Sequence, residues 1–583
     1  MVDVLGLAAV IVFYLLILGV GIWAGRKNKS PSGQTSSNSE DVMLAGRSIG
    51  MFVGVFTMIA TWVGGGLING TAEIVFRGGE GGGLVWCQGP FGYAISLLIA
   101  GKFFIKPMRA EGYVTMLDPF QLKFGRRMGA LLFLPALLGD IFWSAAILSA
   151  LGSTLTVIVG LNDILSIVLS ACIAIVYTMF GGLYSVAYTD VIQLICIFVG
   201  LWICVPFALT HEKVIPISSS KAQWLGTLTG RYAGVYIDTY MVLLLGGIPW
   251  QEFFQRVLAA KTTRNAQMLS YVGTVGCAVM AIPSILIGAV ARSADWTNTT
   301  IGHSPGTNGS DHEFRMVLPL VLQNFTPTAV AFIGLGAVSA AVMSSADSAI
   351  LAAGTLFARN IYKFLIREKA TEREILIVMK LTVVAVGAMA TGLAICIRSV
   401  YGLWFLCSDL VYVILFPQLV LVLYYRNANT YGSLAGYVIG MLLRLLGGEP
   451  IIGLPPIIPY FNLLDNDDTQ LFPFRTFAML VSLATIVATS ELTRHLFITK
   501  ELLDLRWDVF HCFHKDDDPP VKVATIHFRK PEVPLPVNGE SMFTKKRRRP
   551  SLSKRGSDAG ENFSEKGVAG VYNAAFDVSE TTL

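Results

Sequence analysis

The chain consists of long apolar runs that are separated by short polar stretches. A helix needs about twenty apolar residues to cross a bilayer, and about thirteen runs along this sequence approach that length. Two of them are interrupted by glycine, and one is long enough to be bent. The runs lie at about 4–24, 48–76 (broken), 84–105, 128–159, 162–180, 188–209, 236–257 (broken), 266–291, 316–358 (long), 375–397, 401–425, 430–446 and 473–497. The pattern predicts an all-α integral membrane protein of about thirteen transmembrane helices.

Basic residues gather in alternate loops between these runs. Membrane proteins keep Lys and Arg on the cytosolic side, so the alternation indicates an N-terminus outside and a C-terminal tail in the cytosol. Asn298-Thr299-Thr300 and Asn308-Gly309-Ser310 are glycosylation motifs, and both fall in a predicted outside loop. We therefore expect glycans at Asn298 and Asn308. The predicted inside loops, which are rich in Lys and Arg, are 26–47, 102–127, 256–264 and 359–373.

Composition agrees with a membrane protein. Of the 583 residues, 54% are hydrophobic and 14% are charged, whereas soluble chains carry about 25% charged residues. The chain turns polar from about residue 503, and we expect 503–583 to be a disordered cytosolic tail. Its basic cluster at 545–549 is consistent with lipid headgroup binding, with a kinase or trafficking partner near Ser551, or with a merely solvated tail. The eight cysteines show no CxxC spacing and indicate helix packing rather than a disulfide or metal site.

The two glycine breaks divide the chain into corresponding halves. We expect a first helix and cytosolic loop (1–47), a first five-helix repeat (48–210), a second five-helix repeat (211–425), two C-terminal helices (426–502) and the tail (503–583). An odd number of helices inverts the second repeat, so the two breaks face each other near the membrane midplane. Unwound backbone at that depth is tolerated only where protein buries it or a wet cavity adjoins it. The breaks therefore indicate the central site of a secondary transporter, although close helix packing at small residues is the alternative.

Aromatic residues adjoin both breaks. Trp62 precedes the first break, Thr61-Trp62-Val63-Gly64-Gly65-Gly66, and Trp250 ends the second, Gly246-Gly247-Ile248-Pro249-Trp250. The end of a half-helix is partly negative and tryptophan faces attract cations, so an organic cation is the expected ligand. Tyr93 and Trp143 are further candidates. Asp140 shares a helix face with Trp143, and it either balances the cation or hydrogen-bonds to a neighbouring helix.

A stripe of small, oxygen-bearing residues runs along the helix predicted over 316–358. At 100° per residue the stripe consists of Ala341, Ser344, Ser345 and Ser348. Asp347 lies beside it, and carbonyl groups freed at Ala60 and Val63 would complete a sodium site of the kind built on broken helices. Serine bonding to its own helix backbone is the alternative reading. Asp190 either reaches this region or caps a helix.

Several stretches are typical of one transporter family. Through Gly181-Gly182-Leu183, Tyr188-Thr189-Asp190 and Ser344-Ser345 the chain resembles the sodium:solute symporter family. Over roughly residues 4–500 it resembles more narrowly the choline-transporting members of that family. The stretches that carry this narrower resemblance are 61–66, 68–73, 246–251, 336–348 and 447–450.

The resemblance implies a LeuT-type fold, a 5+5 inverted repeat with extra N- and C-terminal helices. It also implies uptake of choline across the plasma membrane that depends on sodium (Na+) and chloride (Cl−). In animals that uptake supplies acetylcholine synthesis, at presynaptic terminals and their vesicles. The implied choline cage consists of Trp62, Tyr93, Trp143 and Trp250. The implied sodium site consists of the Ala60 and Val63 carbonyls with Ala341, Ser344 and Ser345, and a further ion position lies near Thr61, Asp190, Ser345 and Asp347.

Two positions depart from the family pattern, and other functions remain alternatives. Leu67 stands where the family commonly has Tyr, and Asp140 where Glu is common, so the surroundings of the cage differ. The runner-up function is a sodium symporter for another small solute, but no Lys or Arg adjoins either break to pair an anion. A channel would show a filter repeat, and about thirteen spans exceed a seven-helix receptor. The sequence shows no nucleophile–base pair of the kind that would indicate an enzyme. It shows no sign of nucleic-acid binding either.

Overall fold

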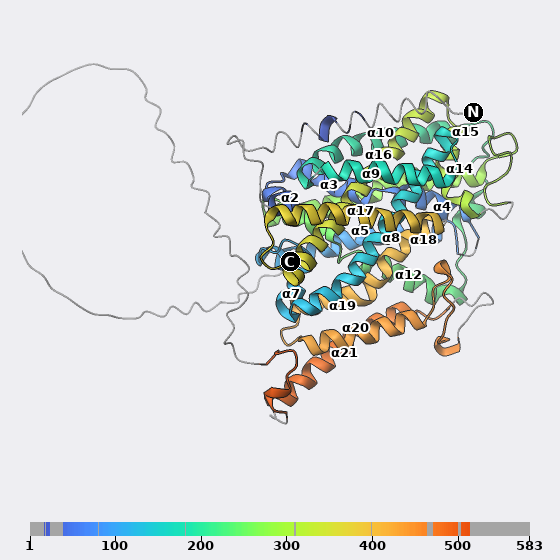
Figure 1. Cartoon of the computed structure of the whole chain (residues 1–583). Helices are drawn as coiled ribbons and strands as arrows, with labels where there is room; N and C mark the ends of the chain where they lie inside the picture. The colour runs from blue at the N-terminus through green and yellow to red at the C-terminus, as the bar shows by residue number, and fades with distance from the viewer. Residues whose placement is uncertain are drawn as a thin grey trace, which may run out of the picture. The chain divides into compact units, whose positions relative to one another are not determined.

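The computed structural model describes 39–79, 81–180, 182–307, 311–397, 399–462, 470–499 and 503–513, with a few positions between 15 and 23. Nearly all of its regular structure is helical, as Figure 1 shows. The described residues belong to one unit that spans Met1–Asp518. The α-helices are α2 (Ser39–Leu44), α3 (Met51–Trp62), α4 (Thr71–Arg77), α5 (Gly89–Ile99), α6 (Ile105–Ala110), α7 (Asp118–Phe124), α8 (Arg126–Val159), α9 (Asp163–Phe180), α10 (Leu183–Leu209), α11 (Lys221–Leu225), α12 (Ala233–Gly246), α13 (Gln251–Ala259), α14 (Thr263–Ser293), α15 (Val317–Asn324), α16 (Thr328–Leu356), α17 (Glu372–Cys396), α18 (Val400–Leu410), α19 (Phe416–Tyr424), α20 (Thr430–Leu446) and α21 (Phe474–Arg494).

The helices confirm the all-α membrane class. Within the described residues, nine helices are long and apolar enough to cross a membrane, or ten if the bent pair α3 and α4 forms one span. Helices α9 and α20 are apolar but shorter. The helix expected at 4–24 lies almost wholly outside the described residues, and so does the tail beyond 513. The exact number of thirteen spans therefore stays a prediction.

The long run at 316–358 is two helices rather than one. Helix α15 ends at Asn324, and α16 begins at Thr328 after Pro327. Proline has no backbone N–H to donate and its ring obstructs the preceding turn, so the helix restarts at this residue. Helix α16 then carries the predicted serine stripe without interruption.

Both predicted breaks are present. Helix α3 ends at Trp62, the backbone leaves the helix at Val63 (φ −86°, ψ 67°), and α4 continues at an angle of 52° after one wide turn. Helix α12 ends at Gly246, and the chain is extended at Trp250 (φ −116°, ψ 133°) before α13 begins. Gly246 is required by close approach, since a Cβ there would lie 2.6 Å from the Ser408 carbonyl oxygen of α18.

Segments that were predicted on the same side of the membrane contact one another. From two predicted inside loops, Arg126 forms an ion pair with Glu368 at 2.9 Å. From two predicted outside loops, the Lys213 ammonium donates to the Asn298 carbonyl at 3.2 Å. These contacts agree with the alternation that the charges predict.

A buried ionic cluster joins the C-terminal helix pair α20 and α21, which lie side by side (Figure 1), to α12 and α18. Arg444 pairs with Asp409 and also with Glu449, at 2.6 Å. Arg475 reaches the same Glu449 at 2.6 Å, Asp409 at 3.5 Å and Asp238 at 3.6 Å. Each side chain is at least nine-tenths buried, so the partners compensate charges that water does not reach.

Candidate functional site

A cavity adjoins both breaks. Its empty volume, including open solvent, is about 260 Å3. Both broken helices contribute to its wall, together with α5, α8 and α18. It is lined by Thr61, Trp62, Tyr93, Trp143, Trp250, Glu252, Trp404 and Cys407. The four aromatic residues predicted for a cation cage therefore meet in one place.

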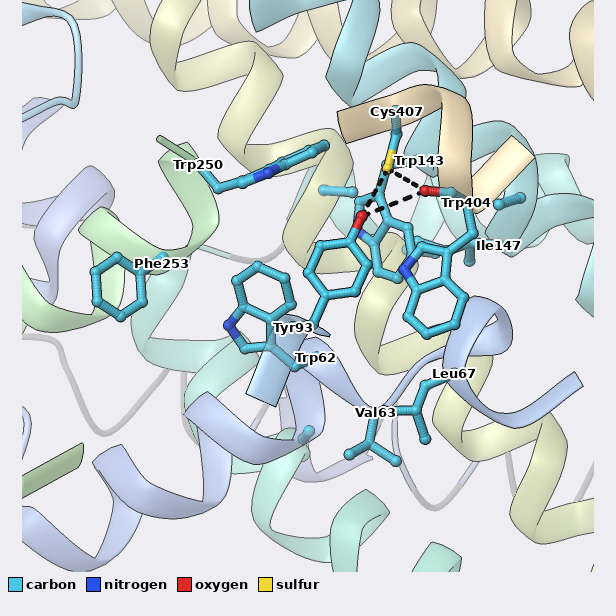
Figure 2. Packing of buried hydrophobic residues seen from close by; sticks show 14 of the residues in the cluster. Trp62, Val63, Leu67, Tyr93, Trp143, Ile147, Trp250, Phe253, Trp404 and Cys407 are labelled. Atoms are coloured by element: carbon cyan, nitrogen blue, oxygen red, sulfur yellow. Dashed lines mark hydrogen bonds between the residues drawn. The ribbon is translucent and has the colours of Figure 1, made fainter. Parts of the chain in front are cut away.

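The aromatic rings form a continuous wall. The Tyr93 ring lies between the indoles of Trp62 and Trp404 (Figure 2), with ring centroids 5.4 Å and 5.1 Å away. The Trp143 indole lies 6.4 Å from that of Trp404. Such separations are those of favourable aromatic pairs, and all four rings belong to residues that line the cavity.

Hydrogen bonds fix the orientation of two of these rings. The Tyr93 hydroxyl is hydrogen-bonded to the Ser408 hydroxyl. It also donates to the Trp404 carbonyl oxygen at 3.3 Å, a bond that Figure 2 shows as a dashed line. The Trp250 indole N–H donates to the Gly246 carbonyl at 2.7 Å, so the second break holds its own tryptophan. The buried indole N–H of Trp62 has no hydrogen-bond partner among the described residues.

The cavity lining also contains one acidic residue, Glu252, which lies two residues after Trp250. Its side chain is buried, and neither carboxylate oxygen has a hydrogen-bond partner within the described part of the chain. Asp140 of α8 is also buried with one unpartnered oxygen, and the charges of the two carboxylates interact. No hydrogen bond of Asp140 to a neighbouring helix is found among the described residues.

Sequence reasoning missed Trp404 and Glu252. A carboxylate inside an apolar span is costly, so the argument that singled out Asp140 applies equally to Glu252 within the predicted span 236–257. Trp404 lies near the start of the span predicted at 401–425, where a tryptophan of the membrane interface is equally typical. The sequence therefore held a signal for Glu252 but an ambiguous one for Trp404.

Oxygen atoms from the first break meet the serine stripe of α16. The Ser345 hydroxyl donates to the carbonyl oxygens of Ala60 at 3.3 Å and Thr61 at 3.1 Å, and the Ser344 hydroxyl lies 3.4 Å from the Ala60 oxygen. All four residues are buried. The bonds run to the broken helix rather than back along α16, so backbone bonding within that helix does not account for these two serines.

Asp190 belongs to the same cluster. Its carboxylate accepts hydrogen bonds from the hydroxyls of Ser344 and Thr57, both at 2.5 Å. Because α10 begins at Leu183 after Gly182, Asp190 lies two turns inside the helix, and the alternative of a helix cap is wrong. A carboxylate, hydroxyls and carbonyls in one buried place are the hard oxygen donors that suit a hard cation such as sodium.

The other predicted ion ligands are placed less directly. Asp347 accepts a hydrogen bond from the Thr178 hydroxyl of α9 at 2.9 Å, while its second oxygen has no partner among the described residues. Val63 lies where the chain leaves α3, and Ala341 lies one turn before Ser345 on α16. Their roles stay predictions. Of the two predicted glycosylation sites, Asn298 is exposed and Asn308 lies outside the described residues.

Comparisons with known proteins agree with this architecture. Residues 42–440 match the model of the sodium:solute symporter family. The chain is 54% identical to the high-affinity choline transporter 1 of Drosophila melanogaster, over 88% of this chain and 82% of that relative. It is 53% identical to the high affinity choline transporter 1 of Homo sapiens, over 84% of this chain and 86% of that relative. A solved structure of a Na+-coupled sialic acid symporter has a TM-score of 0.65 and 16% identity, covering 84% of this chain and 98% of that one, so it shows a shared fold.

Proposed function

Because the chain belongs to the sodium:solute symporter family, we propose that it takes up choline together with sodium across the plasma membrane. It is a transporter and not an enzyme. The observation that carries the choice of substrate is the aromatic wall of Trp62, Tyr93, Trp143 and Trp404 between the two breaks. The names of the similar transporters from fly and human support the same choice.

The cavity suits a quaternary ammonium ion. Such a cation has no N–H to donate, so it is recognised by electron-rich ring faces rather than by hydrogen-bond acceptors. None of the residues that line the cavity is Lys or Arg, which would repel a cation or pair an anion. A symporter for a carboxylate solute would need such a partner, and the alternative of another small organic solute is therefore less well supported.

Sodium fits the oxygen cluster around Ala60, Thr61, Ser344, Ser345 and Asp190. There it would join the end of α3 to α16 and, together with the charge of Arg256, balance the buried Asp190 carboxylate. Trp62 follows these carbonyls directly, so the ion would also order the first wall of the choline cavity. Import of each positive charge gains about 2.3 kcal/mol per 100 mV of inside-negative potential.

We propose the alternating-access cycle of broken-helix transporters, in which the two breaks move together to open the cavity first outward and then inward. The N-terminus is placed outside and the tail in the cytosol, on the basis of the charged loops. Chloride dependence, supply of acetylcholine synthesis and a presynaptic location rest on the resemblance to choline-transporting family members. Asn298 is a proposed glycosylation site because it is exposed in a predicted outside loop.

Uptake of radiolabelled choline into proteoliposomes that contain the purified protein tests this function. We expect accumulation that requires an inward sodium gradient and that exceeds the outside concentration. Trp62→Ala is expected to abolish it, while Trp202→Ala, which removes an indole from α10 outside the cavity, is expected to retain it. Sodium-independent equilibration would indicate a channel, and normal uptake by Trp62→Ala would exclude the cage.

A further inference from the structure

The carboxylate of Glu252 is the polar feature of the cavity that choline binding by aromatic rings leaves unexplained. The side chain is 2% exposed, lines the cavity, and accepts no hydrogen bond from any other described residue. Asp140, also 2% exposed, lies within electrostatic range of Glu252. Burying a carboxylate without a partner is costly, so the arrangement favours a ligand that supplies one.

Arg256, whose charge acts on Glu252, does not form an ion pair with the Glu252 carboxylate in this structure. Arg256 lies one turn after Glu252 on α13, and its charge is felt by that carboxylate. Its guanidinium, however, donates to the backbone carbonyl of Glu252 at 3.3 Å, to the Gln255 side chain at 3.4 Å and to the Ser348 hydroxyl. Arg256 therefore points toward the serine stripe, and the Glu252 carboxylate remains available to the cavity.

The cavity also offers a donor that matches this acceptor. The indole N–H of Trp62 is buried and has no partner in the described part of the chain. An indole only donates and a carboxylate only accepts, whereas a hydroxyl group does both. A ligand hydroxyl is thus a group that can pair with either of these lining residues, while the rings hold the ammonium end.

We propose that Glu252 accepts a hydrogen bond from the hydroxyl of the transported cation and so selects hydroxylated quaternary ammonium ions. The inference rests on the proposed function and adds a specificity-determining residue to it. Glu252 also disfavours a ligand such as betaine, whose carboxylate would take the place of the hydroxyl.

Inhibition of radiolabelled choline uptake by three unlabelled compounds tests the inference. The compounds are choline, propyltrimethylammonium, in which a methyl group replaces the hydroxyl, and betaine. A hydrogen bond to a charged group corresponds to about tenfold or more in affinity, so the wild-type protein should prefer choline to propyltrimethylammonium by that factor. Betaine should inhibit least.

In E252A the preference should fall to about threefold or less because choline weakens while propyltrimethylammonium changes little. E252Q, whose amide oxygen still accepts, should retain part of the preference. E212Q, at an exposed position outside the cavity, is the matched control and should keep the wild-type pattern. Surface biotinylation normalises each variant.

Three outcomes would overturn the inference. The first is a wild-type protein that does not distinguish choline from propyltrimethylammonium, a result that needs no variant to fold. The second is an equal loss of affinity for both compounds in E252A, since that would make Glu252 a counter-charge only. The third is the absence of sodium-driven choline uptake by the wild-type protein, which would refute the proposed function itself and is read separately from the other two.

Discussion

Gly64→Ala is expected to separate the first break from the serine stripe. A Cβ at residue 64 would lie 2.2 Å from the Ser345 hydroxyl oxygen and 2.6 Å from the Ser345 Cβ. Ordinary contact begins at 3.4 Å, so the methyl group and the hydroxyl oxygen must move apart by about 1.2 Å. Binding groups must be held within about 0.5 Å of their productive positions, and the same hydroxyl contacts the Ala60 and Thr61 carbonyls.

The expected magnitude follows from the cost of overpacking, which is about 1–3 kcal/mol. If the sodium-bound arrangement carries that cost, the sodium concentration for half-maximal choline uptake should rise about 5- to 150-fold, since each 1.4 kcal/mol is a factor of ten. The measurement is the sodium dependence of choline uptake into proteoliposomes. Gly336→Ala is the matched control, because beyond the adjoining backbone of α16 itself no described atom lies within 4 Å of a Cβ at that position.

A second variant separates packing from ion binding. Gly64→Ala with Ser345→Gly removes both atoms that the new methyl group would strike. We expect it to regain the thermal stability that Gly64→Ala loses but not the sodium affinity, because the hydroxyl is gone. Unchanged sodium dependence in Gly64→Ala would refute the reasoning, and wild-type sodium dependence in the double variant would exclude Ser345 as a ligand.

Three further outcomes are expected. Trp404→Ala removes the ring stacked on Tyr93 and should raise the choline concentration for half-maximal uptake about tenfold or more. Trp404→Phe keeps a ring and should raise that concentration less, and equal values in both variants would contradict this expectation. Arg444→Met leaves Asp409 without a main partner and should destabilise the purified protein by about 3–5 kcal/mol in a denaturation assay, and an unchanged transition would show that the cluster is not compensated as described. Asn298→Gln should reduce the mobility shift that glycosidase treatment produces in protein made in animal cells, and Asn298→Gln with Asn308→Gln should remove it; an unchanged shift in the single variant would show that Asn298 carries no glycan.

The breaks were the part of the fold that local chemistry made predictable. Glycine is needed at 64 and 246 because neighbouring helices approach closely. Glycines within an otherwise apolar run are easily recognised in the sequence. The positions of Trp62 and Trp250 next to the breaks predicted that both would line the central site, and both line the cavity. Asp140 and Trp143 were placed on one helix face by spacing, and both lie buried on α8.

Other features depend on how distant helices meet. Trp404 lines the cavity because α18 packs against α8 and the wide turn of the first break. The sequence of its own span does not predict that contact. The hydrogen bonds between Asp190 and the hydroxyls of Thr57 and Ser344 join three helices, so local sequence left helix capping open. Pro327 and the polar residues around it, Asn324, Thr326 and Thr328, did mark the division of the 316–358 run, but apolar residues on both sides made it read as one long, bent helix.

The ionic cluster of Arg444, Arg475, Asp409, Glu449 and Asp238 has a consequence for how this protein diverges. Two guanidinium groups face three carboxylates here, so neutral replacement of either arginine leaves three buried carboxylates with one cation, and removing one partner of a buried pair is far more harmful than removing both. Substitutions here are therefore strongly non-additive. An arginine of this cluster is therefore best exchanged together with its acidic partner, which couples substitutions in α12, α18 and the C-terminal helices.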